Sequence, residues 1–324
     1  MLKRILAVFL SAFFVLLSFG GCGGVKKGEK LTVVCSVFPL YDWARTITAG
    51  AEGVEVILLV KNGSDAHSYQ PTAEDMIHIA SCDLLLWVGG ESEGWIGQAL
   101  GKNPAEGRRS LCMQEIEGVT LREISDESQE HDHEGHDHAD GTTDEHLWLS
   151  PNNALAMARA ITEALAEAEG EQEALFRDNF SDYEKKLLVL DTKFSTLAAQ
   201  YENGFLLFAD RFPFVYLTEE YGIGYVAAFR GCSTDAEAGF DTILRLADAI
   251  DENSLHYIVV TETSDSSLAE SVRRATKNKD QRIVVMHSLQ ALTLADAEKG
   301  VSYRTIMEEN LEILKEVLDN KPIS

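Results

Sequence analysis

A single stripe of large apolar side chains constrains the fold of this chain more than any other feature of its sequence. Its members follow one another at alternating intervals of four and three residues, which places them on one face of an α-helix. They are Phe176, Phe180, Tyr183, Leu187, Leu190, Phe194 and Leu197. A helix over residues 171–200 would be roughly 45 Å long at the standard rise per residue. Such a rod must pair with another helix as a coiled coil or pack along a larger body.

The sequence on either side of this helix alternates between strand and helix patterns. Strand runs precede it at residues 31–37, 54–60, 84–88 and near 111–121, and follow it at 205–209, 225–229, 257–260 and 283–286. This alternation is typical of α/β lobes with mainly parallel sheets flanked by helices. We therefore expect an α/β protein with two lobes joined by one long rigid helix, in preference to a coiled coil. The expected boundaries are 31–170 for the first lobe, 171–200 for the linking helix and 201–324 for the second lobe.

The N-terminus has the pattern of an export signal. Lys3 and Arg4 precede an apolar run that ends in small residues before Cys22. Residues 1–21 are expected to be a signal peptide and 22–30 a tether. The segment resembles a bacterial lipoprotein signal, in which Cys22 becomes the lipidated first residue of the mature chain. An uncleaved membrane anchor is the alternative, and the short run makes it less expected.

Charge and cysteine usage narrow the function further. The formal net charge of −25 repels nucleic acid and raises the local concentration of cations. Beyond Cys22 there are four cysteines, an even number in an exported chain, so one or two disulfides are permitted. They are Cys35, Cys82, Cys112 and Cys232. No two of them form a CxxC pair, which argues against a zinc site built from thiolates.

The segment 129–142 is rich in histidine and acidic residues. It is too polar to pack a core, but it can chelate a divalent cation, and we interpret it as an auxiliary metal-gathering loop. Its histidines are His131, His133, His136 and His138. The alternative is an acidic loop whose histidines have no function. His146 differs from them because it leads directly into an apolar turn and a helix start at Ser150-Pro151, and we interpret it as a fixed ligand.

Three further candidate ligands stand near the carboxyl ends of predicted strands, where open α/β sheets bind their ligands. His67 lies in the loop after strand 54–60, Asp210 follows strand 205–209, and His287 follows strand 283–286. Together with His146 they supply three imidazoles and one carboxylate. That set suits tetrahedral Zn²⁺ better than Ca²⁺ or Mg²⁺, and Mn²⁺ prefers more oxygen donors. Glu262, also at a strand end, is the alternative carboxylate.

Several stretches of the sequence are similar to a known family. They are Gly63–Thr72 with Asp75, Asp144–Pro151, Tyr183–Asp191 in the long helix, and Phe208–Phe214 with Tyr221-Gly222. Residues 31–318 resemble the substrate-binding lipoproteins of bacterial zinc and manganese ABC importers, known as metal-binding cluster A-I. The resemblance implies two α/β lobes joined by one long helix, a metal ion between the lobes, and an acidic histidine-rich loop before the second ligand. The family's third ligand is usually His or Glu and the fourth an acid. The nearest positions here hold Asp210 and His287.

These observations predict a function in metal uptake. We expect a monomer, lipid-anchored to the bacterial cell membrane and extracytoplasmic, that captures Zn²⁺ and delivers it to an ABC permease. It is expected to be neither an enzyme nor a nucleic-acid-binding protein. The alternatives are a Mn²⁺-binding member of the same family, a surface adhesin or interaction lipoprotein, and a zinc hydrolase in which a water replaces the Asp210 ligand.

Overall fold

The structure of the protein is a computed structural model. It describes residues 30–322, with gaps at 62, 64–65, 103–108, 124–142 and 230–237. The expected signal peptide, Cys22, the histidine-rich loop with His131, His133, His136 and His138, and Cys232 lie outside the described residues. The chain divides into Met1–Lys30 and Leu31–Ser324, and everything below concerns the second unit.

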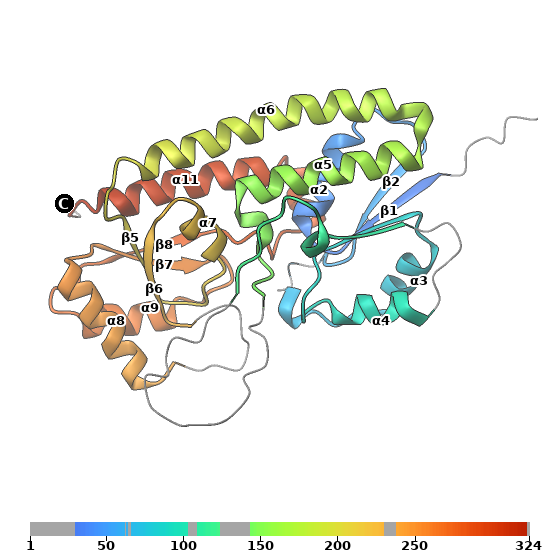
Figure 1. The fold of residues 1–324 in the computed structure, drawn as a ribbon. Helices are drawn as coiled ribbons and strands as arrows, with labels where there is room; N and C mark the ends of the chain where they lie inside the picture. Colours follow the sequence, from blue (N-terminus) through green and yellow to red (C-terminus); the bar gives the residue numbers. More distant parts are fainter. Residues whose placement is uncertain are drawn as a thin grey trace, which may run out of the picture. The chain divides into compact units, whose positions relative to one another are not determined.

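The first half of this unit forms a four-stranded parallel sheet in the order β2-β1-β3-β4 (Figure 1). Its strands are β1 (Leu31–Cys35), β2 (Val54–Leu58), β3 (Leu84–Trp87) and β4 (Arg109–Cys112). The helices between them are α2 (Phe38–Ile47), α3 (Ala73–Ser81) and α4 (Gly94–Lys102). The central strand β1 pairs with β2 and β3, and its side chains are almost wholly buried, as expected for a parallel sheet covered on both faces.

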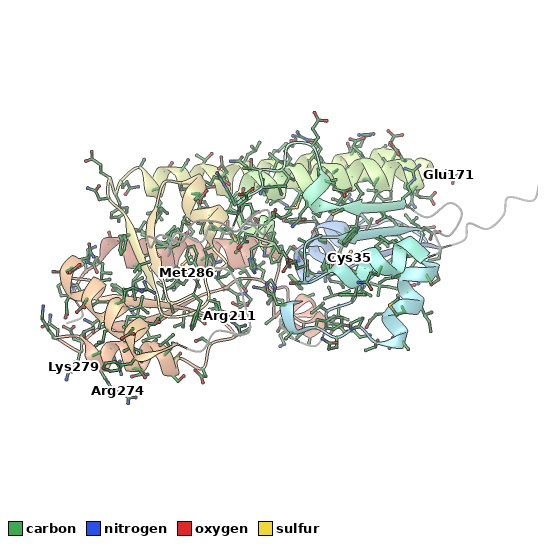
Figure 2. The ribbon with its side chains drawn as sticks, turned by 60° about the horizontal axis from the view of Figure 1, so that its bottom comes forward. Cys35, Glu171, Arg211, Arg274, Lys279 and Met286 are labelled. Atoms are coloured by element: carbon green, nitrogen blue, oxygen red, sulfur yellow. The ribbon has the colours of Figure 1, made fainter. Side chains whose placement is uncertain are left out.

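The second half repeats the pattern with a parallel sheet in the order β6-β5-β7-β8. Its strands are β5 (Phe205–Phe208), β6 (Gly224–Ala227), β7 (Tyr257–Thr261) and β8 (Arg282–Met286). Its helices are α7 (Val215–Glu220), α8 (Phe240–Asn253), α9 (Ser267–Ala275), α10 (Leu294–Glu298) and α11 (Tyr303–Asp319). Cys35 and Met286, labelled in Figure 2, mark the carboxyl ends of β1 and β8.

A layer of long helices runs along both sheets. In Figure 1, α6 (Glu173–Ala198) extends above α5 (Pro151–Ala168) and α11. All seven residues of the predicted stripe are buried on α6, and each of the six Phe and Leu side chains among them contributes roughly 1.5–3 kcal/mol by leaving water. They belong to one hydrophobic core that also contains side chains of β1, β3, β5 and β8. The predicted fold class is confirmed. The stripe packs within its own chain, as expected for a helix that joins two lobes and does not form a coiled coil.

The start of α5 also follows the sequence prediction. Pro151 occupies the first turn, where a missing amide hydrogen costs no helical hydrogen bond. The Ser150 side chain caps the helix by accepting a hydrogen bond from the backbone N–H of Asn153 at 2.9 Å. This cap fixes the direction in which the chain leaves His146.

The described cysteines are all free thiols. Cys35, Cys82 and Cys112 form no disulfide with one another, and Cys232 lies outside the described part of the chain. Burial raises the pKa of the Cys35 thiol, which therefore stays neutral and packs as a small apolar side chain.

None of the helices that the structure describes is both long enough and apolar enough to cross a membrane.

Candidate metal site

His146 is held by a buried carboxylate. Its side chain is 1% exposed, and Nδ1 lies 2.8 Å from Oδ1 of Asp144. The same oxygen accepts the backbone N–H of His146 at 2.8 Å. A carboxylate at Nδ1 keeps the ring hydrogen on that nitrogen, so Nε2 carries the lone pair. This is the tautomer that a metal ligand needs, and the carboxylate also fixes the plane of the ring.

Three hydrogen bonds tie the segment around His146 to the second half of the chain. The Tyr216 hydroxyl donates to the carbonyl oxygen of Asp144 at 2.7 Å. Nε1 of Trp148 donates to the carbonyl oxygen of Ser288, and the Tyr303 hydroxyl donates to the carbonyl oxygen of Trp148, each at 2.8 Å. The second half of the chain therefore positions His146, although the residue comes before the long helix in the sequence.

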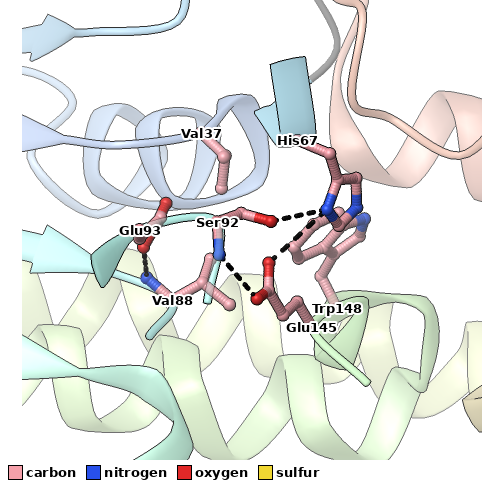
Figure 3. A pocket seen from close by; sticks show the side chains of 7 residues that line it. All are labelled: Val37, His67, Val88, Ser92, Glu93, Glu145 and Trp148. Atoms are coloured by element: carbon pink, nitrogen blue, oxygen red, sulfur yellow. Dashed lines mark hydrogen bonds and ion pairs between the residues drawn. The ribbon is translucent and has the colours of Figure 1, made fainter. Parts of the chain in front are cut away.

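His67 approaches the same point from the loop after β2. It lies in a 3₁₀ turn, Ala66–Ser68, and its Nδ1 is 2.6 Å from the Ser92 hydroxyl and 3.7 Å from Oε2 of Glu145 (Figure 3). Its Nε2 is 3.1 Å from Nε2 of His146. Two nitrogen ligands of a tetrahedral zinc ion, each bonded at about 2.0–2.1 Å, lie roughly 3.3–3.4 Å apart. The two imidazoles are therefore already spaced almost as neighbouring zinc ligands.

A small pocket beside His67 is built on the turn after β3. Its lining consists of Val37, His67, Val88, Ser92, Glu93, Glu145 and Trp148 (Figure 3). Oε1 of Glu145 accepts the backbone N–H of Ser92 at 2.9 Å. Oε2 of Glu93 accepts the backbone N–H groups of Val88 at 2.6 Å and Gly89 at 3.1 Å. The pKa of the Glu93 carboxyl is raised to about 7, chiefly by burial and to a smaller extent by the nearby Glu145 carboxylate, while these hydrogen bonds act to lower it.

Gly90 lets this turn approach Glu145. Its φ is +85°, a left-handed conformation that side chains disfavour, and a Cβ atom there would lie 2.3 Å from Oε1 of Glu145. Gly50 has a similar φ of +80°, but a Cβ there would meet nothing within 4 Å. A substitution at Gly50 therefore introduces backbone strain alone, whereas the same substitution at Gly90 introduces backbone strain and a steric clash with Glu145.

Gly90→Ala is expected to destabilise the protein more than Gly50→Ala. The backbone strain is common to both and costs about 1–2 kcal/mol. The displacement of Glu145 adds about 1 kcal/mol at Gly90 only, because the part-buried hydrogen bond that Glu145 accepts from the Ser92 N–H is disturbed. Urea unfolding of both variants measures the difference. Equal losses would show that Glu145 moves aside without cost.

The structure places Asp210 at the carboxyl end of β5 and binds both of its oxygens to protein groups. Oδ1 accepts the backbone N–H of Arg211 at 2.8 Å. Oδ2 accepts the backbone N–H of Thr261 at 3.0 Å and its hydroxyl at 2.6 Å. The carboxylate thus joins the ends of β5 and β7.

His287 lies beside Glu262, which the sequence suggested as the alternative carboxylate. Its Nδ1 lies 3.3 Å from Oε1 of Glu262 and accepts the backbone N–H of Leu289 at 2.9 Å. Burial lowers the pKa of His287, and the Glu262 carboxylate partly opposes that effect. Glu262 also accepts the backbone N–H and the hydroxyl of Ser288.

The structure therefore brings two of the four predicted ligands together. His67 and His146 meet, whereas Asp210 and His287 are engaged by neighbours of their own. Within the described ranges, no group of three or more His, Cys, Asp or Glu side chains is arranged to hold a metal ion. The set of four stays a prediction.

Sequence reasoning missed the groups that surround the two imidazoles. Gln290, 6% exposed, has its Nε2 2.9 Å from Nε2 of His146. Ser92 and Glu145 contact His67, and Asp144 contacts His146. A carboxylate two residues before a candidate histidine was a usable signal for Asp144. A neutral amide gave no comparable signal for Gln290.

The two sheets and the helical layer define a two-lobed α/β protein, and two imidazoles from distant parts of its first half meet within it. The chain belongs to the ZnuA family, described as zinc-uptake complex component A, periplasmic, whose model matches residues 33–317. The resemblance expected from the sequence is confirmed. Because this is a family of substrate-binding proteins, the zinc hydrolase alternative is set aside.

Two curated relatives illustrate the similarity. The high-affinity zinc uptake system protein ZnuA of Bacillus subtilis is 28% identical over 314 residues, covering 95% of this chain and 96% of the relative. The zinc-binding lipoprotein AdcA of Streptococcus pneumoniae is 27% identical over 304 residues, covering 93% of this chain. The chain spans 58% of the length of that streptococcal relative.

Solved structures share the fold. The Zn(II)-bound ZnuA-like domain of Streptococcus pneumoniae AdcA matches with a TM-score of 0.71 and 24% identity, covering 90% of this chain and 99% of that domain. The Mn-bound periplasmic metal binding protein of Candidatus Liberibacter asiaticus matches with a TM-score of 0.71 and 19% identity, covering 89% of this chain and all of that one. At these identities the structures support the architecture and do not choose between the metals.

Proposed function

We propose that this protein captures extracytoplasmic Zn²⁺ at a site built on His67 and His146 and delivers it to the permease of an ABC importer. The observation that carries this proposal is the 3.1 Å separation of the two Nε2 atoms. Each ring has a hydrogen-bonding group at Nδ1, Asp144 for His146 and Ser92 with Glu145 for His67. These partners can hold hydrogen on Nδ1 and direct both lone pairs at one ion.

The donor atoms favour zinc over manganese. Two imidazole nitrogens suit Zn²⁺, whereas Mn²⁺ prefers a shell of oxygen atoms. The prediction that Asp210 and His287 complete the shell remains part of the proposal. It requires Asp210 to give up its hydrogen bonds from Thr261, and His287 to turn away from the Leu289 N–H.

Lipid anchoring through Cys22 and metal gathering by His131, His133, His136 and His138 belong to the same proposal. Relatives from Streptococcus pneumoniae and Bacillus subtilis are named lipoproteins, which supports the anchor. The anchor would keep the protein near its permease, and the loop would raise the local concentration of zinc beside the tight site.

The test measures the zinc content and affinity of the chain from Lys30 onward, with and without residues 129–142. One tight zinc equivalent is expected in both forms by competition with a chelator, and additional weak equivalents only when the loop is present. Loss of all tight zinc with the loop would overturn the site. Tighter binding of Mn²⁺ than of Zn²⁺ in the same competition would overturn the choice of metal.

A further inference from the structure

A buried glutamine lies at the meeting point of the two imidazoles. Nε2 of Gln290 is 2.9 Å from Nε2 of His146. The same nitrogen of His146 lies 3.1 Å from Nε2 of His67. Gln290 follows β8 in the loop that begins at His287, so it belongs to the second half of the chain. Because the Asp144 carboxylate holds hydrogen on Nδ1 of His146, the amide donates to the lone pair that would face a metal ion.

A glutamine amide can either donate a hydrogen bond to a lone pair through its nitrogen or coordinate a cation through its oxygen. A half turn about its last side-chain torsion exchanges the amide nitrogen and oxygen. The oxygen then occupies the place of the donor, and an amide oxygen is an accepted ligand of divalent cations. The exchange moves no backbone atom, so the glutamine can donate to His146 in one state and bind an ion in the other.

We propose that Gln290 is a third protein ligand of the captured ion, through Oε1. This inference rests on the proposed function, because it adds a ligand to the site that begins with His67 and His146. The three side chains that meet at this point are neutral ligands, and Asp210 can cancel charge within the coordination shell only after it gives up its hydrogen bonds from Thr261. Asp144 and Glu145, which contact the two imidazoles, supply negative charge immediately outside the shell.

The rival interpretation is that Gln290 only orients the His146 ring through its N–H. Gln290→Glu separates the two roles, because glutamate keeps an oxygen at the same place and has no N–H to donate. Gln290→Leu removes both. Gln281→Glu is the matched control, since Gln281 is also buried but lies at the opposite end of β8.

The experiment measures Zn²⁺ affinity of the full mature chain by chelator competition, after circular dichroism has confirmed that each variant is folded. We expect Gln290→Leu to weaken binding by at least about tenfold. We expect Gln290→Glu to strengthen it by about tenfold or more, because a full negative charge replaces an amide dipole. Gln281→Glu should leave the affinity unchanged.

Two results would overturn the inference. If Gln290→Glu weakened Zn²⁺ binding as much as Gln290→Leu, Gln290 would only orient the His146 ring. If neither variant changed the Zn²⁺ affinity, Gln290 would have no role in binding. Co²⁺ provides a second readout, because its absorption spectrum changes when a ligand of the ion is replaced and should differ between the wild type and both Gln290 variants. If the wild-type chain itself binds no zinc, the proposed function fails. If the wild type binds and the Gln290 variants match it, only this inference fails.

Discussion

His67→Ala is expected to lower the affinity of the protein for Zn²⁺ by more than about 100-fold, and His146→Ala by at least as much. Loss of an outer group that merely orients a ligand already costs 10–100-fold, so loss of the ligand itself should exceed that range. The two Nε2 atoms lie 3.1 Å apart, and among the described residues no group of three or more His, Cys, Asp or Glu side chains could hold the ion in their place. Competition with a chelator of known affinity measures the change.

The two variants differ in what they do to folding. His146 is 1% exposed and its removal leaves the buried carboxylate of Asp144 without its charge-assisted partner, which costs several kcal/mol of stability. His67 is more accessible, so His67→Ala provides the cleaner measurement. His78→Ala is the control, because His78 lies on α3 and contacts the exposed Glu74. An affinity of His67→Ala equal to that of His78→Ala would remove the basis of the proposed site.

Glu93→Gln is expected to change how the stability of the protein depends on pH. The carboxyl is 5% exposed and its pKa is raised by burial from 4.5 to about 7. Between these values the folded state holds a proton that the unfolded state has lost. The stability that this provides is complete below about pH 4.5 and is lost as the pH rises through 7, by roughly 3 kcal/mol in all.

Glutamine resembles the protonated carboxyl and still presents an oxygen to the backbone N–H groups of Val88 and Gly89. The variant should therefore match the wild type near pH 5 and exceed its free energy of unfolding by roughly 2–3 kcal/mol at pH 8. Urea unfolding at the two pH values tests this, with the exposed Glu117→Gln as the control. Parallel pH profiles for the wild type and Glu93→Gln would show that the carboxyl ionises without cost in the folded protein.

Much of the fold could be predicted because its signals are local and repeated. The apolar stripe from Phe176 to Leu197 predicted a helix too long to pack against a single small sheet. The alternation of apolar runs with helix patterns around it predicted parallel strands. The boundaries were less accurate. A strand was expected near 111–121, but β4 ends at Cys112 and a 3₁₀ turn follows at Met113–Glu115. Apolar residues after the strand pack against the core from that turn and from the loop that follows.

The site was only partly readable for a different reason. Strand ends indicate where a ligand can bind, but they do not reveal which polar side chains already have partners. Asp210 accepts hydrogen bonds from Thr261, and His287 lies beside Glu262 and accepts the N–H of Leu289, contacts that no spacing in the sequence reveals. Gln290 reaches His146 across 144 residues of sequence, and its uncharged side chain matches no ligand pattern.

The hydrophobic core shared by both sheets has a mechanical consequence. Side chains from β1, β3, β5 and β8 pack together with the stripe of α6, so the halves cannot swing apart as two bodies on a flexible hinge without exposing that core. In the proposed function, the membrane permease would therefore recognise the loaded protein by small displacements of its surface, not by a change in its outline. The side chain of His67 is 15% exposed and that of His146 only 1%, so the turn that carries His67 is a place where the arrival of an ion can alter the surface.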